Sequence, residues 1–217
     1  SGSLTVPKLT KGTQNFSVNF NGGTLKANAA STAFLSAIGG TAKVQAGGAI
    51  IDDGGFAITV GQALVEDTGS TGGGLTKSGI GVLTLGGTNT YTGGTAVNSG
   101  ILTYLNTTAK PATGTTTVAA NATLGLGVGT GLFSSTDVDS LFAGTLAGVT
   151  NSATSHVGID TTAGSFTYSS SVPANAKGLV KLGANTLTLN GTNAYTGGTT
   201  VHGGTLTLLG DQTAASG

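Results

Sequence analysis

Short runs of alternating apolar and polar residues recur along the chain. Val82–Leu85, Leu102–Tyr104 and Leu206–Leu208 each contain a threonine between two apolar residues, which are leucines except for Tyr104. A period of two is typical of β-strands that have one buried face. The pattern therefore predicts an inward-facing set, Leu83, Leu85, Leu102, Leu187, Leu189 and Leu206, and an outward-facing set, Thr84, Thr103, Thr188 and Thr207.

The chain also contains a long internal repeat. Residues 75–106 and 179–210 align without a gap at an offset of 104 positions, and 19 of their 32 positions are identical. The shared positions include Lys77 with Lys181 and Tyr91 with Tyr195. Such self-similarity indicates a repeat architecture rather than a conventional globular core.

A fainter signal has a shorter period. Gly-Gly-Thr-Leu or a close variant occurs at 22–25, 47–50, 99–102, 121–124 and 203–206, with adjacent intervals of 25 and 22 residues. This length suits one coil of a parallel β-helix, in which each strand stacks on its counterpart in the next coil. We therefore expect an all-β chain in which residues 1–217 form one parallel β-helix of about nine or ten coils, with glycine at the tight corners.

One segment departs from the strand pattern. Residues 134–144 begin with an N-cap serine, carry acids in the first turn and end in glycine, which predicts a short helix. The weakly patterned stretch 127–173 around it is interpreted as an irregular excursion from the coil, with a further strand at 165–169.

The two long units resemble the passenger-associated transport repeat, also called the autotransporter-associated β-strand repeat. The resemblance is carried by the Lys77 and Lys181 positions, the Leu-Thr-Leu of 83–85 and 187–189, and the shared Tyr-Thr-Gly-Gly-Thr. It implies a right-handed parallel β-helix in a large secreted or surface protein of a Gram-negative-type bacterium. It transfers no catalytic residue to this chain.

Composition excludes several classes of partner. Of 217 residues 40 are Gly and none is Cys, only 7% are charged, and the eight basic residues, all lysine, balance eight acids. A net charge of zero leaves no basic stripe for nucleic acid or for an anionic membrane surface. No apolar run approaches the length of a membrane span.

Parallel β-helices also include enzymes that cleave polysaccharides, in which acidic residues act as catalysts. The acids of this chain are Asp52, Asp53, Glu66, Asp67, Asp137, Asp139, Asp160 and Asp211. Neighbouring residues of a strand face opposite sides, so neither adjacent acid pair forms a catalytic dyad unless it lies in a turn. Without arginine and without converging carboxylates, no catalytic, cofactor-binding or metal-binding residue is assigned, and no cofactor is expected.

Other candidates also have structural interpretations. Asp137 and Asp139 fit helix capping better than a calcium loop, and the glycine run 125–131 fits a corner or strand better than a phosphate cradle. His156 and His202 have no cysteine or acidic cluster near them in the sequence that could complete a metal site, and His202 is expected in an exposed turn.

The tyrosine and the lysine that recur in both repeats also have structural interpretations. Tyr91 and Tyr195 are expected to pack across a turn and lock adjacent coils, with a sugar-binding platform as the alternative. Lys77 and Lys181 are expected at solvated strand ends.

The function predicted from these features is structural. Neither residues 1–13 nor residues 209–217 read as an amphipathic cap, which predicts stacking end to end with another copy or with neighbouring segments of a larger chain. The chain is thus expected to be an extracellular or cell-surface stalk, adhesin segment or fibre subunit, and not an enzyme. The alternative is a carbohydrate-binding or carbohydrate-cleaving β-helix, for which surface glycans would be the partner.

Overall fold

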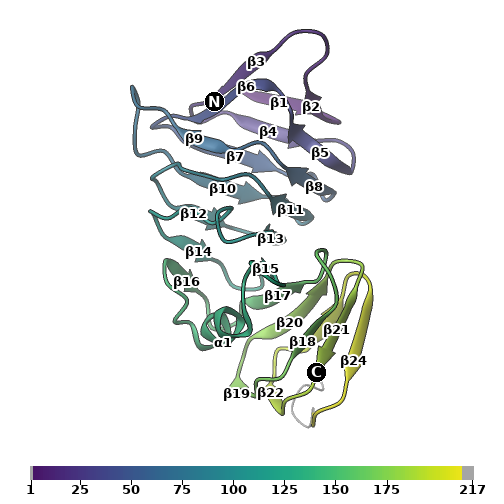
Figure 1. Cartoon of the computed structure of the whole chain (residues 1–217). Helices are drawn as coiled ribbons and strands as arrows, with labels where there is room; N and C mark the ends of the chain where they lie inside the picture. Colours follow the sequence, from purple (N-terminus) through teal and green to yellow (C-terminus); the bar gives the residue numbers. More distant parts are fainter. Residues whose placement is uncertain (1, 212–217) are drawn as a thin grey trace.

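The computed structural model describes residues 2–211 and shows a β-solenoid. All pairings between named strands in this range are parallel, and strands far apart in sequence stack in successive coils (Figure 1). No helix in the described range is long and apolar enough to span a membrane. The all-β fold class and the single helix predicted from the sequence are confirmed.

The strands form five parallel sheets. A nine-stranded sheet runs the length of the molecule and contains β2 (Leu9–Thr10), β5 (Ser31–Ser36), β8 (Ala57–Val60), β11 (Val82–Leu85), β13 (Ile101–Tyr104), β15 (Thr123–Gly127), β17 (His156–Asp160), β20 (Gly178–Leu182) and β23 (Thr199–Val201). A seven-stranded sheet contains β1 (Ser3–Val6), β4 (Thr24–Ala27), β7 (Ala49–Asp52), β10 (Leu75–Ser78), β12 (Thr95–Val97), β14 (Thr116–Val118) and β16 (Val149–Asn151).

Smaller sheets complete the two ends. The N-terminal coils have a third face made of β3 (Phe16–Phe20), β6 (Gly39–Val44) and β9 (Leu64–Glu66). The C-terminal coils use a three-stranded sheet of β18 (Phe166–Tyr168), β21 (Thr186–Leu189) and β24 (Thr205–Leu208), and a two-stranded sheet of β19 (Val172–Asn175) and β22 (Asn193–Tyr195).

The register of the nine-stranded sheet gives the number of coils and the number of residues in each coil. Nine strands correspond to nine coils, as the sequence predicts. The step from Ala57 to its partner Val82 is 25 positions, and the step from Val82 to Ile101 is 19. The step from Thr123 to His156 is 33 positions, because this coil contains the helix.

The helix α1 (Ser135–Ala143) is bounded by the capping residues that the sequence predicts. Ser134 is the N-cap, and its side chain and that of Asp137 form a reciprocal capping box, while Gly144 ends the helix with φ of 75°. Val138, Leu141 and Phe142 are buried against the solenoid. The strand expected at 165–169 is also present, as β18.

The two long repeats occupy different faces of the solenoid. In the first, the lysine strand β10 belongs to the seven-stranded sheet and β11 to the nine-stranded sheet. In the second, the lysine strand β20 belongs to the nine-stranded sheet and β21 to the three-stranded C-terminal sheet. The second unit is therefore displaced by one face, and Figure 1 shows its strands inclined to those of the N-terminal coils.

One apolar core runs along the inside. Leu83, Leu85, Leu102, Leu187 and Leu189 are buried in it, and Leu206 packs against it, as predicted. Thr84, Thr188 and Thr207 are partly exposed, whereas Thr103 is fully buried. Thr103 does face outward, and Ile101, Val180 and Leu182 form a second small cluster on that outer face of the sheet.

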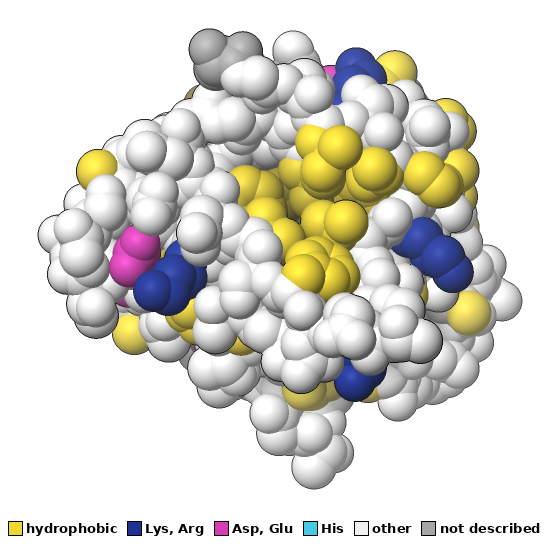
Figure 2. All heavy atoms as spheres, turned by 90° about the horizontal axis from the view of Figure 1, so that it is seen from above, with side chains coloured by type: hydrophobic (Ala, Val, Ile, Leu, Met, Phe, Trp, Pro, Cys, Tyr) yellow, Lys and Arg dark blue, Asp and Glu magenta, His cyan; other side chains and the backbone are white. Residues whose placement is uncertain are grey.

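The N-terminal end of the core is open. A hollow of about 420 Å³ is lined by residues that include Leu4, Leu9, Val18, Phe20 and Leu25. Viewed from this end, the apolar surface fills the centre of the molecule within a polar rim (Figure 2). At the other end, residues 212–217 lie outside the described range. Most of the segment 209–217, which is expected not to form an amphipathic cap, therefore lies outside the described residues.

Candidate functional site

Lys77 is buried in the core, which contradicts the expected solvated strand end. Its side chain has no exposed surface, because its strand position faces inward with Leu75. The ammonium group donates hydrogen bonds to the carbonyl oxygens of Ser78 at 3.2 Å, Gly79 at 2.7 Å and Ser99 at 3.0 Å. It also forms an ion pair with the equally buried carboxylate of Asp53.

Lys181 repeats this arrangement 104 residues later. It is also fully buried, so the expected solvated end is wrong here too. Its Nζ donates to the carbonyl oxygens of Leu182 at 2.6 Å, Gly183 at 2.7 Å and Gly203 at 3.0 Å. We call each set of three carbonyl oxygens a lysine cradle, since it satisfies the three donors of an ammonium group.

The two cradles differ in the residue that follows the preceding strand. Strand register places Asp52 beside Ser78 and Asp160 beside Leu182, so Asp53 and Thr161 hold equivalent positions. Thr161 is buried and its hydroxyl donates to the Leu182 and Asn185 carbonyl oxygens. A carboxylate therefore lies beside the first cradle, and a hydroxyl lies at the equivalent position beside the second.

Electrostatics follow from this difference. Burial lowers the pKa of Lys77, and the neighbouring Asp53 and Asp52 offset part of the shift. Burial also lowers the pKa of Lys181, with an opposing effect from the charge of Asp160. An unpaired buried charge is costly, which explains why three carbonyl oxygens converge on each lysine.

The repeated tyrosines pack inside the turns, as predicted. Tyr91 and Tyr195 are buried, and each hydroxyl shares a hydrogen bond with the threonine four residues later, at 2.6 Å with Thr95 and 2.7 Å with Thr199. The Tyr195 ring also stacks on Phe142 of α1, with centroids 5.7 Å apart. Buried rings provide no platform for a sugar, so that alternative is wrong for these two residues.

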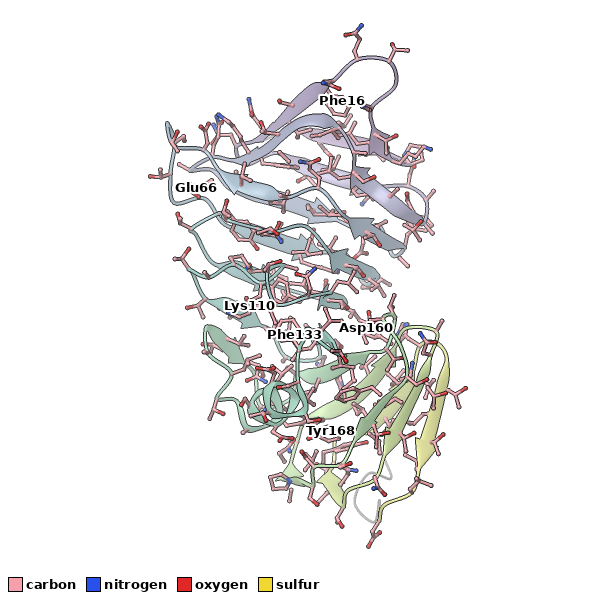
Figure 3. The ribbon with its side chains drawn as sticks, viewed as in Figure 1. Phe16, Glu66, Lys110, Phe133, Asp160 and Tyr168 are labelled. Carbon is pink, nitrogen blue, oxygen red and sulfur yellow. The ribbon has the colours of Figure 1, made fainter. Side chains whose placement is uncertain are left out.

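The acids do not converge on a catalytic centre. Asp52 pairs with Lys26 at 2.7 Å on the outside while Asp53 faces inward, as expected for neighbouring positions. Glu66 accepts hydrogen bonds from Gly72 and Thr92. Figure 3 shows Glu66 and Asp160 at separate levels of the solenoid. The other member of the second adjacent pair, Asp67, binds Lys43 and Gln45.

The remaining candidates have structural contacts. Asp137 caps α1 as predicted, whereas Asp139 accepts hydrogen bonds from Tyr168 at 2.6 Å and Ser170 at 3.0 Å, and so ties the helix to the next coil. His202 is exposed and His156 opens β17. Within residues 2–211 no three His, Cys, Asp or Glu side chains gather as a possible metal site.

The glycine run 125–131 begins within a strand, as predicted. Gly125 and Gly127 belong to β15. The buried lysines are the main feature that sequence reasoning missed. Their position two residues after Leu75 and Leu179 was the available signal, because a period of two places them on the leucine face.

Comparison with known proteins agrees with the repeat. The family model described as "Passenger-associated-transport-repeat" matches residues 75–103 and 179–208. The chain is similar to the "Adhesin BmaC autotransporter" of Brucella suis biovar 1 (strain 1330), with 35% identity over 165 residues. The match covers 68% of this chain and only 4% of that protein's length. No solved structure matches the chain.

Proposed function

The chain is a structural β-solenoid segment that carries two passenger-associated transport repeats, and from this premise we propose that it spaces or presents adhesive parts of a bacterial surface protein. The observation that supports this role most directly is the continuous core, which passes through stacked coils and contains the leucines and tyrosines that the two repeats share. A rod of this kind gains stability from each coil added to its neighbour.

The chemistry of the described residues favours a non-enzymatic role. The charged groups that are buried deepest are held by backbone carbonyl oxygens or by each other. Outside the core, Asp52 accepts a hydrogen bond from Gly54 and pairs with Lys26, and Asp137 belongs to the helix cap. The relative's name supports adhesion and a location at the cell surface or outside the cell, in a Gram-negative-type bacterium.

We further propose that the open N-terminal end stacks on another solenoid coil. Strands β1, β2 and β3 are edge strands, and each is paired on one side only within the described range. Leu4 is 52% exposed there, beside the apolar hollow. In a longer polypeptide a neighbouring segment would supply the coil, and for the isolated chain a second copy would supply it.

Light scattering on the isolated chain tests this proposal. We expect concentration-dependent association that Leu4→Lys weakens, because a charge in the hollow would be desolvated by the incoming coil. The matched control is Ile80→Lys, since Ile80 is 83% exposed but lies in the turn between β10 and β11. A strictly monomeric chain at high concentration, or equal effects of both variants, would contradict end stacking.

A glycan array with a polysaccharide-cleavage assay tests the wider role. The structural proposal predicts no cleavage of any polysaccharide. Cleavage that persists in repurified protein would favour the carbohydrate-processing alternative.

A further inference from the structure

The contact between Lys77 and Asp53 differs from an ordinary salt bridge. Nζ of Lys77 is the ion-pair partner of Oδ2 of Asp53, yet Oδ2 accepts no hydrogen bond of acceptable geometry. The amine therefore does not meet this oxygen in the geometry of a hydrogen-bonded salt bridge. Nζ also donates hydrogen bonds to the three carbonyl oxygens of the cradle.

The other carboxylate oxygen is held in a different way. Oδ1 of Asp53 accepts the backbone N–H of Gly55 at 2.8 Å and that of Gly81 at 2.7 Å. Two converging N–H donors are what an oxyanion hole provides when negative charge develops on an acyl oxygen. The carboxyl group is thus polarised on one oxygen and faces an amine on the other.

We propose that Lys77 and Asp53 react with each other to form an intramolecular amide, which joins two neighbouring coils covalently. Asp53 directly follows β7, and Lys77 lies in β10, which pairs with β7 in the next coil. The link would close a loop of the chain that contains the turns between these strands. It would resist the separation of the first repeat from the coils before it.

The reaction balances without another reactant. One proton moves from the ammonium group to Oδ2, which gives a neutral amine and a neutral carboxylic acid. The amine lone pair attacks Cγ, and the charge that forms on Oδ1 is stabilised by the two backbone N–H groups. A second nitrogen proton passes to the departing hydroxyl, the Cγ–Oδ2 bond breaks, and water leaves. The amide keeps one N–H for a cradle carbonyl.

Burial favours each of these steps. Both side chains have no exposed surface, so bulk water does not stabilise their charges. Burial lowers the pKa of Lys77, which increases the neutral fraction that can attack. The fold also holds the two groups in contact, which replaces a bimolecular encounter with an intramolecular one. The product is a neutral amide in place of two buried charges.

Lys181 provides an internal control. Its cradle has the same three-carbonyl form, but the position equivalent to Asp53 is Thr161, and no ion pair to Lys181 occurs among the described residues. A hydroxyl cannot acylate an amine. The proposal therefore predicts a linked lysine in the first repeat and a free lysine in the second.

Mass spectrometry of the purified, denatured chain tests the proposal. We expect an intact mass lower than the sequence mass by one water molecule. Trypsin should cleave after Lys181 but not after Lys77, and an amine-reactive reagent should label Lys181 but not Lys77. Fragmentation should locate a branched bond between Lys77 and Asp53.

An independent reaction would cause the same loss of mass. Asp53 precedes Gly54, and an Asp-Gly step can close to a succinimide, which also releases one water. In that case Lys77 would remain labelled and cleaved, and the proposal would be wrong. A full sequence mass, with Lys77 labelled in the denatured chain, would overturn the proposal equally.

Two variants identify the atoms that react. Asp53→Ala removes the acyl carbon and Lys77→Met removes the amine, so each should retain its full sequence mass. Lys181→Met, the matched control, should keep the loss of one water. If a variant fails to fold, the labelling of Lys77 and Lys181 in the wild-type chain still decides the question.

Discussion

The side chain of Leu182 lies against the backbone of Gly125, two strands away on the outer face of the nine-stranded sheet. Its Cδ1 atom is 3.0 Å from the position that a Cβ on Gly125 would occupy, and 3.1 Å from the equivalent position on Gly158. The two glycines thus form a channel that Leu182 fills. This packing covers Thr103 and explains why its outward-facing hydroxyl has no partner.

The channel predicts a steric effect of small substitutions. A Cβ on Gly158 would lie 2.7 Å from the Cα of Gly125, which is backbone and cannot move aside. Gly158→Ala should therefore lower the free energy of unfolding by about 1–3 kcal/mol. Gly12→Ala, with nothing within 4 Å of its Cβ, should change it by less than about 0.5 kcal/mol. Equal denaturant midpoints for the two variants would refute the channel.

Truncation of a core leucine should lower the free energy of unfolding by more than the glycine substitution does. Leu187 has no exposed surface, so Leu187→Ala should cost about 2–5 kcal/mol as lost burial plus a residual cavity. Ile80 is 83% exposed, and Ile80→Ala should lie within about 0.5 kcal/mol of the wild type. Urea unfolding followed by circular dichroism measures both. A small effect at Leu187 would mean that this strand faces the other way.

The buried tyrosines predict destabilisation at alkaline pH. Burial raises the pKa of Tyr91 well above 10.0 and raises the pKa of Tyr195 as well. Because the folded pKa exceeds the unfolded value, this stability is fully present below pH 10 and is lost as the pH rises toward the folded pKa. Thermal unfolding as a function of pH should show a falling midpoint above pH 10.

The phenol groups themselves provide the control for that experiment. Tyrosinate absorbance in the near ultraviolet should appear together with the loss of structure. Ionisation of all four tyrosines at their ordinary pKa in a folded chain would show that the rings are not buried.

The stability that Glu66 provides should be lost at acid pH. Burial opposes ionisation, but hydrogen bonds from Gly72 and Thr92 outweigh it and lower the pKa of Glu66 below 4.5. A lowered folded pKa means that the stability is present above pH 4.5 and is lost as the pH falls through the folded value. The difference in stability between wild type and Glu66→Gln should therefore shrink on acidification. A difference independent of pH would show that the carboxylate charge does not hold this turn.

Much of the fold could be predicted because each strand carries its own pattern. The leucines of 83–85 and 187–189 point inward as their period requires, and Ser134 and Gly144 end the helix as local capping rules require. These are local properties of the chain, so one sequence is sufficient to find them.

The features that were missed depend on neighbouring coils. The Ser99 carbonyl of the next coil and Asp53 of the preceding coil both contact Lys77 in the core. Thr103 is buried only because Leu182 lies over Gly125. The displacement of the second repeat by one face likewise depends on the path of the intervening coils, which the alignment of the two repeats does not contain.

Disulfide trapping of two facing positions tests the parallel solenoid most directly. Thr59 and Thr84 are paired in register on the outer face of β8 and β11, and the chain has no native cysteine. Parallel neighbours about 4.8 Å apart are within the range for a disulfide. We predict that Thr59→Cys with Thr84→Cys forms an intramolecular disulfide under mild oxidation, whereas Thr59→Cys with Thr188→Cys, in separate sheets, does not. If the first pair stays reduced, or if the second pair forms a disulfide, the register between successive coils is wrong.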